Sequence, residues 1–268
     1  MSDADPSVRL SRALRANAER LGGFAERVGY LPEIGSTNDK AIELALGGAP
    51  EGTTVVAGAQ TAGRGRRGHV WSSPAGAGLY ASVVLRPPAL APLVTLMCGV
   101  AIADAMRKVA GLEVALKWPN DLVVEHGGRR KLGGILAEAG TSASGLAHVV
   151  VGFGINLRAA PRPDAPPGTV TSIEAEGARV PSLETLMVEV LAALVSWRAA
   201  MVAGRTGAIL DRWRVLSPSS VDAAVELAGA GGPRRGTTAG IDEDGALLVR
   251  IGGAIERVVA GGGGGGGG

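Results

Sequence analysis

The sequence is poor in cysteine and in aromatic side chains. A single cysteine, Cys98, stands among 268 residues, and Phe, Tyr and Trp together make up 3% of the chain. One thiol cannot build a disulfide framework, which excludes the small disulfide-stabilised secreted domains and favours the cytoplasm. With so few aromatics the core must consist of Ala, Val, Leu and Ile, and we expect Cys98 to be buried in it.

Long apolar runs and a strong excess of one charge are missing as well. No stretch has the ~18 to 20 uninterrupted apolar residues of a membrane span, and no apolar segment of a secretory signal follows the polar residues 1–6. The formal net charge is only +2, which does not indicate nucleic-acid binding by itself. Residues 1–34 also leave no room for a helix-turn-helix domain of ~60 residues. We therefore expect neither a membrane nor DNA as a partner.

An arginine- and glycine-rich stretch is the most unusual feature that is present. It follows an apolar, strand-like run at residues 53–57, and residues 63–68 read GRGRRG, shortly before Trp71. Glycine lets a backbone approach a ligand closely, and guanidinium groups are planar, permanently charged donors suited to phosphate and carboxylate. We interpret this stretch as an anion-binding catalytic loop.

Two other interpretations of this stretch stay open. GRGRRG formally matches the dinucleotide fingerprint GxGxxG, but that fingerprint opens a helix, whereas Pro74, Gly76 and Gly78 follow here. A solvated turn or an RNA-binding RGG-like tract is the other interpretation. Such tracts usually occur as repeats with interleaved aromatics, and this sequence has one copy.

Apolar periodicity and turn residues predict the secondary structure. The expected helices are residues 8–24, 41–46, 91–109, 182–203 and 209–216. The expected strands are residues 27–34, 53–57, 79–85, 114–117, 122–124, 131–139, 147–151, 224–228, 235–241, 246–251 and 255–259. The last four are short and are separated by glycine turns, which is typical of a small barrel.

Five short blocks resemble the biotin protein ligases. In chain order they are GSTN at 35–38, QTAGRGRRG at 60–68, KWPND at 117–121, KLGGIL at 131–136 and GFGIN at 152–156. Each block alone is weakly specific. Together they follow the order and spacing of that family over most of residues 30–157.

The resemblance implies a fold and a domain organisation. The fold would be α+β, with a catalytic domain like that of class II aminoacyl-tRNA synthetases, a mixed and mainly antiparallel sheet, and a C-terminal SH3-like β-barrel. We expect a short helical segment at 1–24, the ligase-like catalytic domain at 25–218, the SH3-like domain at 219–260 and a disordered polyglycine tail at 261–268. The chain would be of the monofunctional type that lacks an N-terminal DNA-binding domain.

The resemblance also implies a reaction. Biotin and ATP, with Mg²⁺, would give biotinyl-5′-AMP and pyrophosphate. A lysine of a biotin carboxyl carrier domain, from acetyl-CoA carboxylase or a related carboxylase, would then attack this mixed anhydride. Homodimer formation is a further expectation from the family that nothing in the sequence fixes.

The family pattern assigns roles to individual residues. Lys131, Arg64 and Arg66 would be catalytic, and Asp121 would bind magnesium. The expected biotin-binding residues are Ser36, Thr37, Asn38, Gln60, Gly63, Arg64, Arg66, Lys131, Gly134 and Gly152. The expected nucleotide-binding residues are Arg66, Arg67, Trp71, Lys117, Asn120 and Asn156.

Simpler interpretations compete with several of these roles. Ser36 or Thr37 is a good N-cap for the helix that follows, Lys131 could be a solvated lysine beside a hairpin, and Asn120 with Asp121 is a common turn. His69 stands where the family commonly has another arginine, which weakens phosphate binding there at high pH. The rival functions are a lipoate ligase or transferase of the same fold and a ligand-binding protein without turnover.

Overall fold

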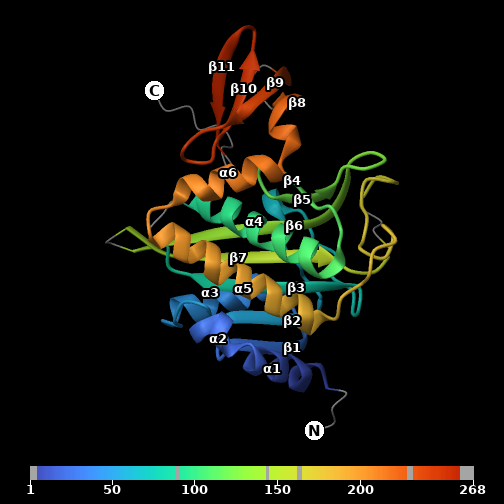
Figure 1. Ribbon diagram of the computed structural model, residues 1–268, viewed down its shortest axis with the longest axis vertical. Helices are drawn as coiled ribbons and strands as arrows, with labels where there is room; N and C mark the ends of the chain where they lie inside the picture. Colours follow the sequence, from blue (N-terminus) through green and yellow to red (C-terminus); the bar gives the residue numbers. More distant parts are fainter. Residues whose placement is uncertain (1–4, 88–90, 143–144, 162–164, 228–231, 260–268) are drawn as a thin grey trace.

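A large β-sheet with helices packed on it and a smaller C-terminal β-sheet make up the protein (Figure 1). The computed structural model describes residues 5–87, 91–142, 145–161, 165–227 and 232–259. The glycine run at 261–268, which we predicted to be disordered, lies outside these residues.

The main sheet has seven strands in the order β1-β2-β3-β7-β6-β5-β4. They are β1 (Val28–Ile34), β2 (Thr54–Gln60), β3 (Gly78–Leu85), β4 (Ala115–Lys117), β5 (Asp121–Val124), β6 (Arg130–Ser142) and β7 (Gly145–Asn156). Only β1 and β2 pair in parallel, and the other neighbours pair antiparallel. This arrangement confirms the predicted α+β class with a mixed, mainly antiparallel sheet.

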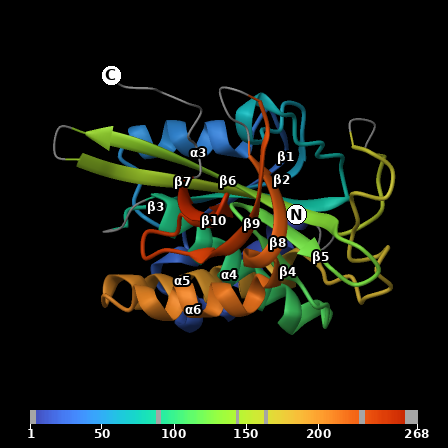
Figure 2. The same cartoon turned by 90° about the horizontal axis from the view of Figure 1, so that it is seen from above.

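Helices cover both faces of this sheet (Figure 2). On one face lies α3 (Thr37–Leu46), whose Ala41 and Ala45 pack with Val84 and Val150. On the opposite face lie α4 (Ala91–Ala110), α5 (Leu183–Val202) and α6 (Thr206–Leu216). The N-terminal elements α1 (Pro6–Ala16), α2 (Ala18–Leu21) and η1 (Gly22–Phe24) pack beside α5 and β1. Successive residues of a strand point to opposite faces of the sheet, so one strand can pack against the helices on both sides.

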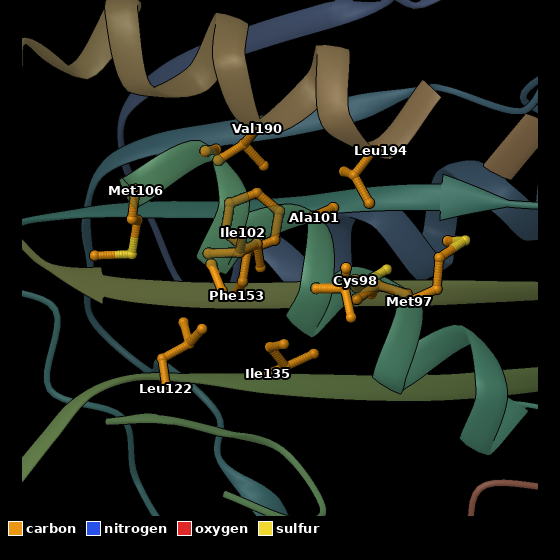
Figure 3. Close-up of a cluster of buried hydrophobic side chains, with 14 of the residues drawn as sticks. Met97, Cys98, Ala101, Ile102, Met106, Leu122, Ile135, Phe153, Val190 and Leu194 are labelled. Carbon is orange, nitrogen blue, oxygen red and sulfur yellow. The ribbon is translucent and has the colours of Figure 1, made fainter. Parts of the chain in front are cut away.

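The principal hydrophobic core lies between α4, α5 and the main sheet (Figure 3). Cys98 and Ile102 of α4 face Ile135 and Phe153 of the sheet, and Val190 of α5 packs behind them. Cys98 is buried as predicted. Burial without a charged partner raises the pKa of its thiol, so that Cys98 acts as a small apolar side chain.

Helix α5 is the one described helix that is long and apolar enough to cross a membrane by length and composition. Its packing accounts for this composition, because α5 contacts α4, α6, α1 and α2. Leu186, Val190 and Leu194 are buried. A helix enclosed by other helices is apolar around most of its circumference. We therefore regard α5 as a core helix.

The C-terminal sheet has four antiparallel strands in the order β11-β10-β9-β8. They follow the short helix η3 (Pro218–Ser220) and are β8 (Val221–Leu227), β9 (Arg234–Ile241), β10 (Leu247–Ile251) and β11 (Ala254–Val258). These strands agree with the predicted small antiparallel β-domain, and among the described residues the sheet is not closed, since β8 and β11 lie at its opposite edges.

Contacts join the C-terminal sheet to the main unit. Trp118 donates a hydrogen bond from Nε1 to the carbonyl oxygen of Gly245 at 3.0 Å. A Cβ at Gly245 would lie 2.8 Å from Leu96 of α4, and the φ of +82° there also favours glycine. Leu247 and Val249 belong to the principal core. The division between residues 218 and 219 into two domains remains a prediction.

Candidate active site

A cleft of about 1400 Å³ lies where the main sheet, the residues after β2 and the C-terminal sheet meet. Gly134 of β6 and Gly152 and Gly154 of β7 line its floor, on the face of the main sheet where Gly152 contacts Asn38 of α3. All but one of the predicted site residues line it: Ser36, Thr37, Asn38, Gln60, Arg64, Arg66, Arg67, Trp71, Lys117, Asn120, Asp121, Lys131, Gly134, Gly152 and Asn156. The exception is Gly63.

The first part of the cleft is a polar slot at the start of α3, which we define by Ser36, Thr37, Asn38, Gln60 and Gly152. Ser36 caps α3, its Oγ accepting from the amide of Asp39 at 3.3 Å. Thr37 donates from its amide and from Oγ1 to Oε1 of Gln60, at 2.8 and 3.1 Å. The helix start therefore serves both as a cap and as a wall of the slot.

The slot has a buried support that the sequence did not reveal. Ser82 of β3 is fully buried, and its Oγ lies 2.8 Å from Oγ1 of Thr37 and 2.7 Å from Oδ1 of Asn38. A Cβ on Gly152 would lie 2.0 Å from Oδ1 of Asn38. Only glycine at 152 lets Asn38 lie flat on the sheet.

The second part is the arginine loop, residues 63–71. A bridge between Arg64 and Val70 folds it back on itself, and the amide of Gly65 donates to the carbonyl oxygen of His69 at 2.7 Å. The amide of Trp71 donates to the carbonyl oxygen of Gly63 at 2.9 Å, and a Cβ on Gly63 would lie 2.3 Å from that tryptophan's carbonyl oxygen. Gly63 therefore shapes the loop from behind and does not line the cleft.

The two arginines predicted to be catalytic have different surroundings. Arg64 pairs with Asp39 at 2.5 Å and with Glu138 at 2.6 Å, and the hydrogen bond that Arg64 donates to Asp39 raises the pKa of Arg64. Arg66 donates to Oδ1 of Asn120 at 3.1 Å, and burial lowers the pKa of Arg66. Arg66 thus carries its charge into the cleft without a carboxylate within ion-pair distance among the described residues.

Trp71 and Lys131 meet above the glycines of the cleft floor. The indole lies against Gly154 and Gly134, where added Cβ atoms would approach it to 2.2 and 3.4 Å. Its buried Nε1 has no hydrogen-bond partner among the described residues. Lys131 Nζ lies 5.5 Å from the ring centroid, and Asp121 accepts from it at 2.6 Å.

The backbone of Lys131 is fixed by a segment from beyond β7. Its amide donates to the carbonyl oxygen of Thr169 at 2.8 Å, and its carbonyl oxygen accepts from the amide of Thr171 at 2.9 Å. Asn156 is buried and donates from Nδ2 to the carbonyl oxygen of Thr171 at 3.0 Å. Asn156, predicted to bind nucleotide, therefore also holds the segment that holds Lys131.

The arrangement resembles known enzymes in sequence and in fold. Residues 30–156 match the Biotin/lipoate A/B protein ligase family. The chain is 32% identical over 235 residues to the bifunctional ligase/repressor BirA of Bacillus subtilis, covering 85% of this chain and 71% of that protein. It is 32% identical over 228 residues to the biotin–[acetyl-CoA-carboxylase] ligase of Paracoccus denitrificans, covering 82% and 92%. The chain belongs to the biotin protein ligase family.

Solved structures of biotin protein ligases share the fold. The ligase from Aquifex aeolicus in complex with biotin and ATP has a TM-score of 0.74 and 26% identity, covering 88% of this chain and 97% of that one. The chain is therefore an enzyme of the ligase class.

Other residues of this biotin protein ligase reach the cleft without having been predicted. The C-terminal sheet supplies Val225, Arg234, Glu256 and Arg257 to its rim. No motif marks them, because a small antiparallel sheet can present many different side chains. Asp39 and Glu138, which pair with Arg64 of the arginine loop, were not predicted either, although Asp39 directly follows GSTN and Glu138 stands two residues beyond KLGGIL.

Proposed function

We propose that this enzyme attaches biotin to a lysine of a biotin carboxyl carrier domain, of acetyl-CoA carboxylase or a related carboxylase, through biotinyl-5′-AMP. The proposal rests on one observation: the polar slot lies in the same cleft as three cationic side chains from separate segments, Arg66, Lys117 and Lys131. The names of the relatives support the carrier and the substrates.

The slot suits the head of biotin. A ureido ring needs a few placed hydrogen-bonding groups within an otherwise close-fitting wall. Thr37, Asn38 and Gln60 supply hydroxyl and amide groups, and Gly152 leaves the floor flat. The carboxylate at the far end of the ligand would then point toward Lys131 and the arginine loop.

The cations suit the joining of two anions. A carboxylate and the α-phosphate of ATP repel each other by about 4 kcal/mol at 4 Å with an effective dielectric constant of 20. Lys131 and Arg66 would offset this repulsion, and preorganised charges act more strongly where water is excluded. Trp71 closes over the same place, which would slow hydrolysis of the mixed anhydride.

The residues present do not form a magnesium site by themselves. Among the described residues no group of three His, Cys, Asp or Glu side chains is close enough to hold a metal ion. The carboxylate of Asp121 already pairs with Lys131 at 2.6 Å and with Lys117 at 3.8 Å. Magnesium commonly binds one or two carboxylates together with substrate phosphates. Asp121 as a magnesium ligand therefore stays a prediction, and we assign no step to the ion.

Exchange of labelled pyrophosphate into ATP tests the first half-reaction. We expect exchange with biotin and none with lipoate, which would separate the enzyme from the lipoate ligases of the same family. Transfer of labelled biotin to a purified carrier domain, with a Lys→Arg carrier as the control, tests the second half-reaction. Exchange with lipoate alone, or with neither acid, would contradict the proposal.

A further inference from the structure

Arg64 is held by two carboxylates from different parts of the chain. Its Nη1 donates to Oδ1 of Asp39 at 2.5 Å and its Nη2 donates to Oε1 of Glu138 at 2.6 Å. Asp39 lies in the first turn of α3, and Glu138 lies on β6. One guanidinium group thus ties the arginine loop to a helix and to the sheet at the same time.

Glu138 also connects Arg64 to the polar slot. Its second oxygen, Oε2, accepts from Nδ2 of Asn38 at 2.7 Å, and Oδ1 of Asn38 lies 2.7 Å from Oγ of Ser82. Ser82 in turn contacts Thr37. A continuous chain of hydrogen bonds therefore runs from the slot through Glu138 to Arg64 in the loop.

We propose that Asp39 and Glu138 form a clasp on Arg64 that closes the arginine loop over the slot, and that Arg64 is a positioning residue. This inference rests on the proposed function for its effect on turnover. Two carboxylates more than balance the single charge of Arg64, so a substrate anion would first have to displace them. Arg66 has no carboxylate within ion-pair distance among the described residues, and it is the loop arginine that meets the anion.

Bidentate use of a guanidinium makes this role specific to arginine. The two nitrogens that donate point to two different carboxylates, which a single ammonium group cannot reproduce. The single charge of a lysine is sufficient to attract an anion, whereas holding both carboxylates at once requires the two separate N–H donors of the guanidinium group. Arg64→Lys therefore separates the two roles.

The clasp can be tested in the ligand-free protein, without any activity measurement. Limited trypsin digestion of wild type and Glu138→Gln would follow cleavage after Arg66 and Arg67 by mass spectrometry. We expect cleavage to be about tenfold faster in Glu138→Gln, the scale of one hydrogen bond to a charged group. Glu43→Gln removes an exposed carboxylate of α3 that pairs with Lys40, and it should cleave like wild type. Equal rates for all three proteins would overturn the clasp.

A double-mutant cycle in biotin-dependent pyrophosphate exchange tests the effect on turnover. We expect Arg64→Gln and Glu138→Gln each to raise KM for biotin about tenfold while kcat changes less than about threefold, and the double variant to match either single variant. Arg64→Lys should behave like Arg64→Gln. Multiplicative effects, or a large loss of kcat that Arg64→Lys restores, would show that Arg64 binds the anion itself. No exchange by wild type would instead refute the proposed function, while the digestion result would still decide on the clasp.

Discussion

Lys131 lies over the face of Trp71, with Nζ 5.5 Å from the ring centroid. Asp121 accepts from the same ammonium group, and backbone hydrogen bonds to residues 169 and 171 fix the strand that carries it. A cation over an indole is stabilised by about 0.5 to 2 kcal/mol. The lysine is thus held in place before any ligand arrives, which is the arrangement expected of an electrostatic catalyst.

Replacing Lys131 by alanine should lower the rate of biotin adenylation by roughly 10² to 10³, the scale of losing one preorganised electrostatic group. The measurement is biotin-dependent pyrophosphate exchange at saturating substrate. Lys108→Ala is a suitable control, because Lys108 lies on α4 and pairs with Glu189 away from the cleft. Unchanged exchange in Lys131→Ala would remove this residue from the catalytic set.

The sequence predicted those site residues that stand inside short motifs. Lys131 and Arg66 were predicted because KLGGIL and GRGRRG occur together with the other blocks, in the order and spacing of the family. Glu138 was not found, because its meaning depends on a partner 74 residues away in the chain, and neither its residue type nor its neighbours point to that partner. Ser82 is similar, because a serine within an apolar strand gives no sign in the sequence that it will contact Thr37 and Asn38 of α3.

The fold shows the same division between local and distant information. Strands β8 to β11 were predicted near their observed places, because alternation and glycine turns are local signals. Whether the four strands close into a barrel depends on pairing between the two edges, which no short pattern encodes. That is why the strands could be predicted from the sequence, whereas the open arrangement of the four described strands could not.

The glycines of the cleft floor should differ in their tolerance of alanine. A Cβ on Gly152 would lie 2.0 Å from Oδ1 of Asn38, whereas one on Gly134 would lie 3.4 Å from Lys131 and Trp71, an ordinary contact. We expect Gly152→Ala to raise KM for biotin more than about 100-fold, because Asn38 must leave its partners, and Gly134→Ala to change it less than about fivefold. Equal effects in two folded variants, with folding checked by circular dichroism, would contradict this view of the floor.

Stability should fall in acid through Glu189. Hydrogen bonds from Arg20 and then Lys108 lower the pKa of this carboxyl group to about 2 in the folded protein, from an ordinary value of 4.5. A lowered pKa means that the stabilisation is complete above pH 4.5 and is lost as the pH falls from about 4.5 toward 2. Since Arg20 and Lys108 are partly in water, we expect about 1 to 2 kcal/mol.

Urea denaturation of wild type and Glu189→Gln at several pH values measures this contribution. The difference in free energy of unfolding between the two proteins should be constant near neutral pH and should shrink between pH 4.5 and 2. Glu19→Gln removes an exposed carboxylate from α2 and serves as the control. A difference that does not depend on pH would rule out the ion pairs as its source.

Trp71→Phe should leave the stability of the ligand-free enzyme nearly unchanged. Phenylalanine keeps a ring over Gly134 and Gly154. It also removes the buried Nε1 donor, which has no hydrogen-bond partner among the described residues. The loss of buried ring area and the removal of an unsatisfied donor should therefore offset each other to within about 1 kcal/mol. Trp213→Phe, in the core, should instead destabilise the protein by about 1 to 3 kcal/mol through a cavity. Denaturation of both variants without ligand checks this contrast. If Trp71→Phe loses as much free energy of unfolding as Trp213→Phe, the indole of Trp71 is a structural element of the fold. If its stability is preserved and its KM for ATP is raised, the Nε1 donor of Trp71 serves substrate binding.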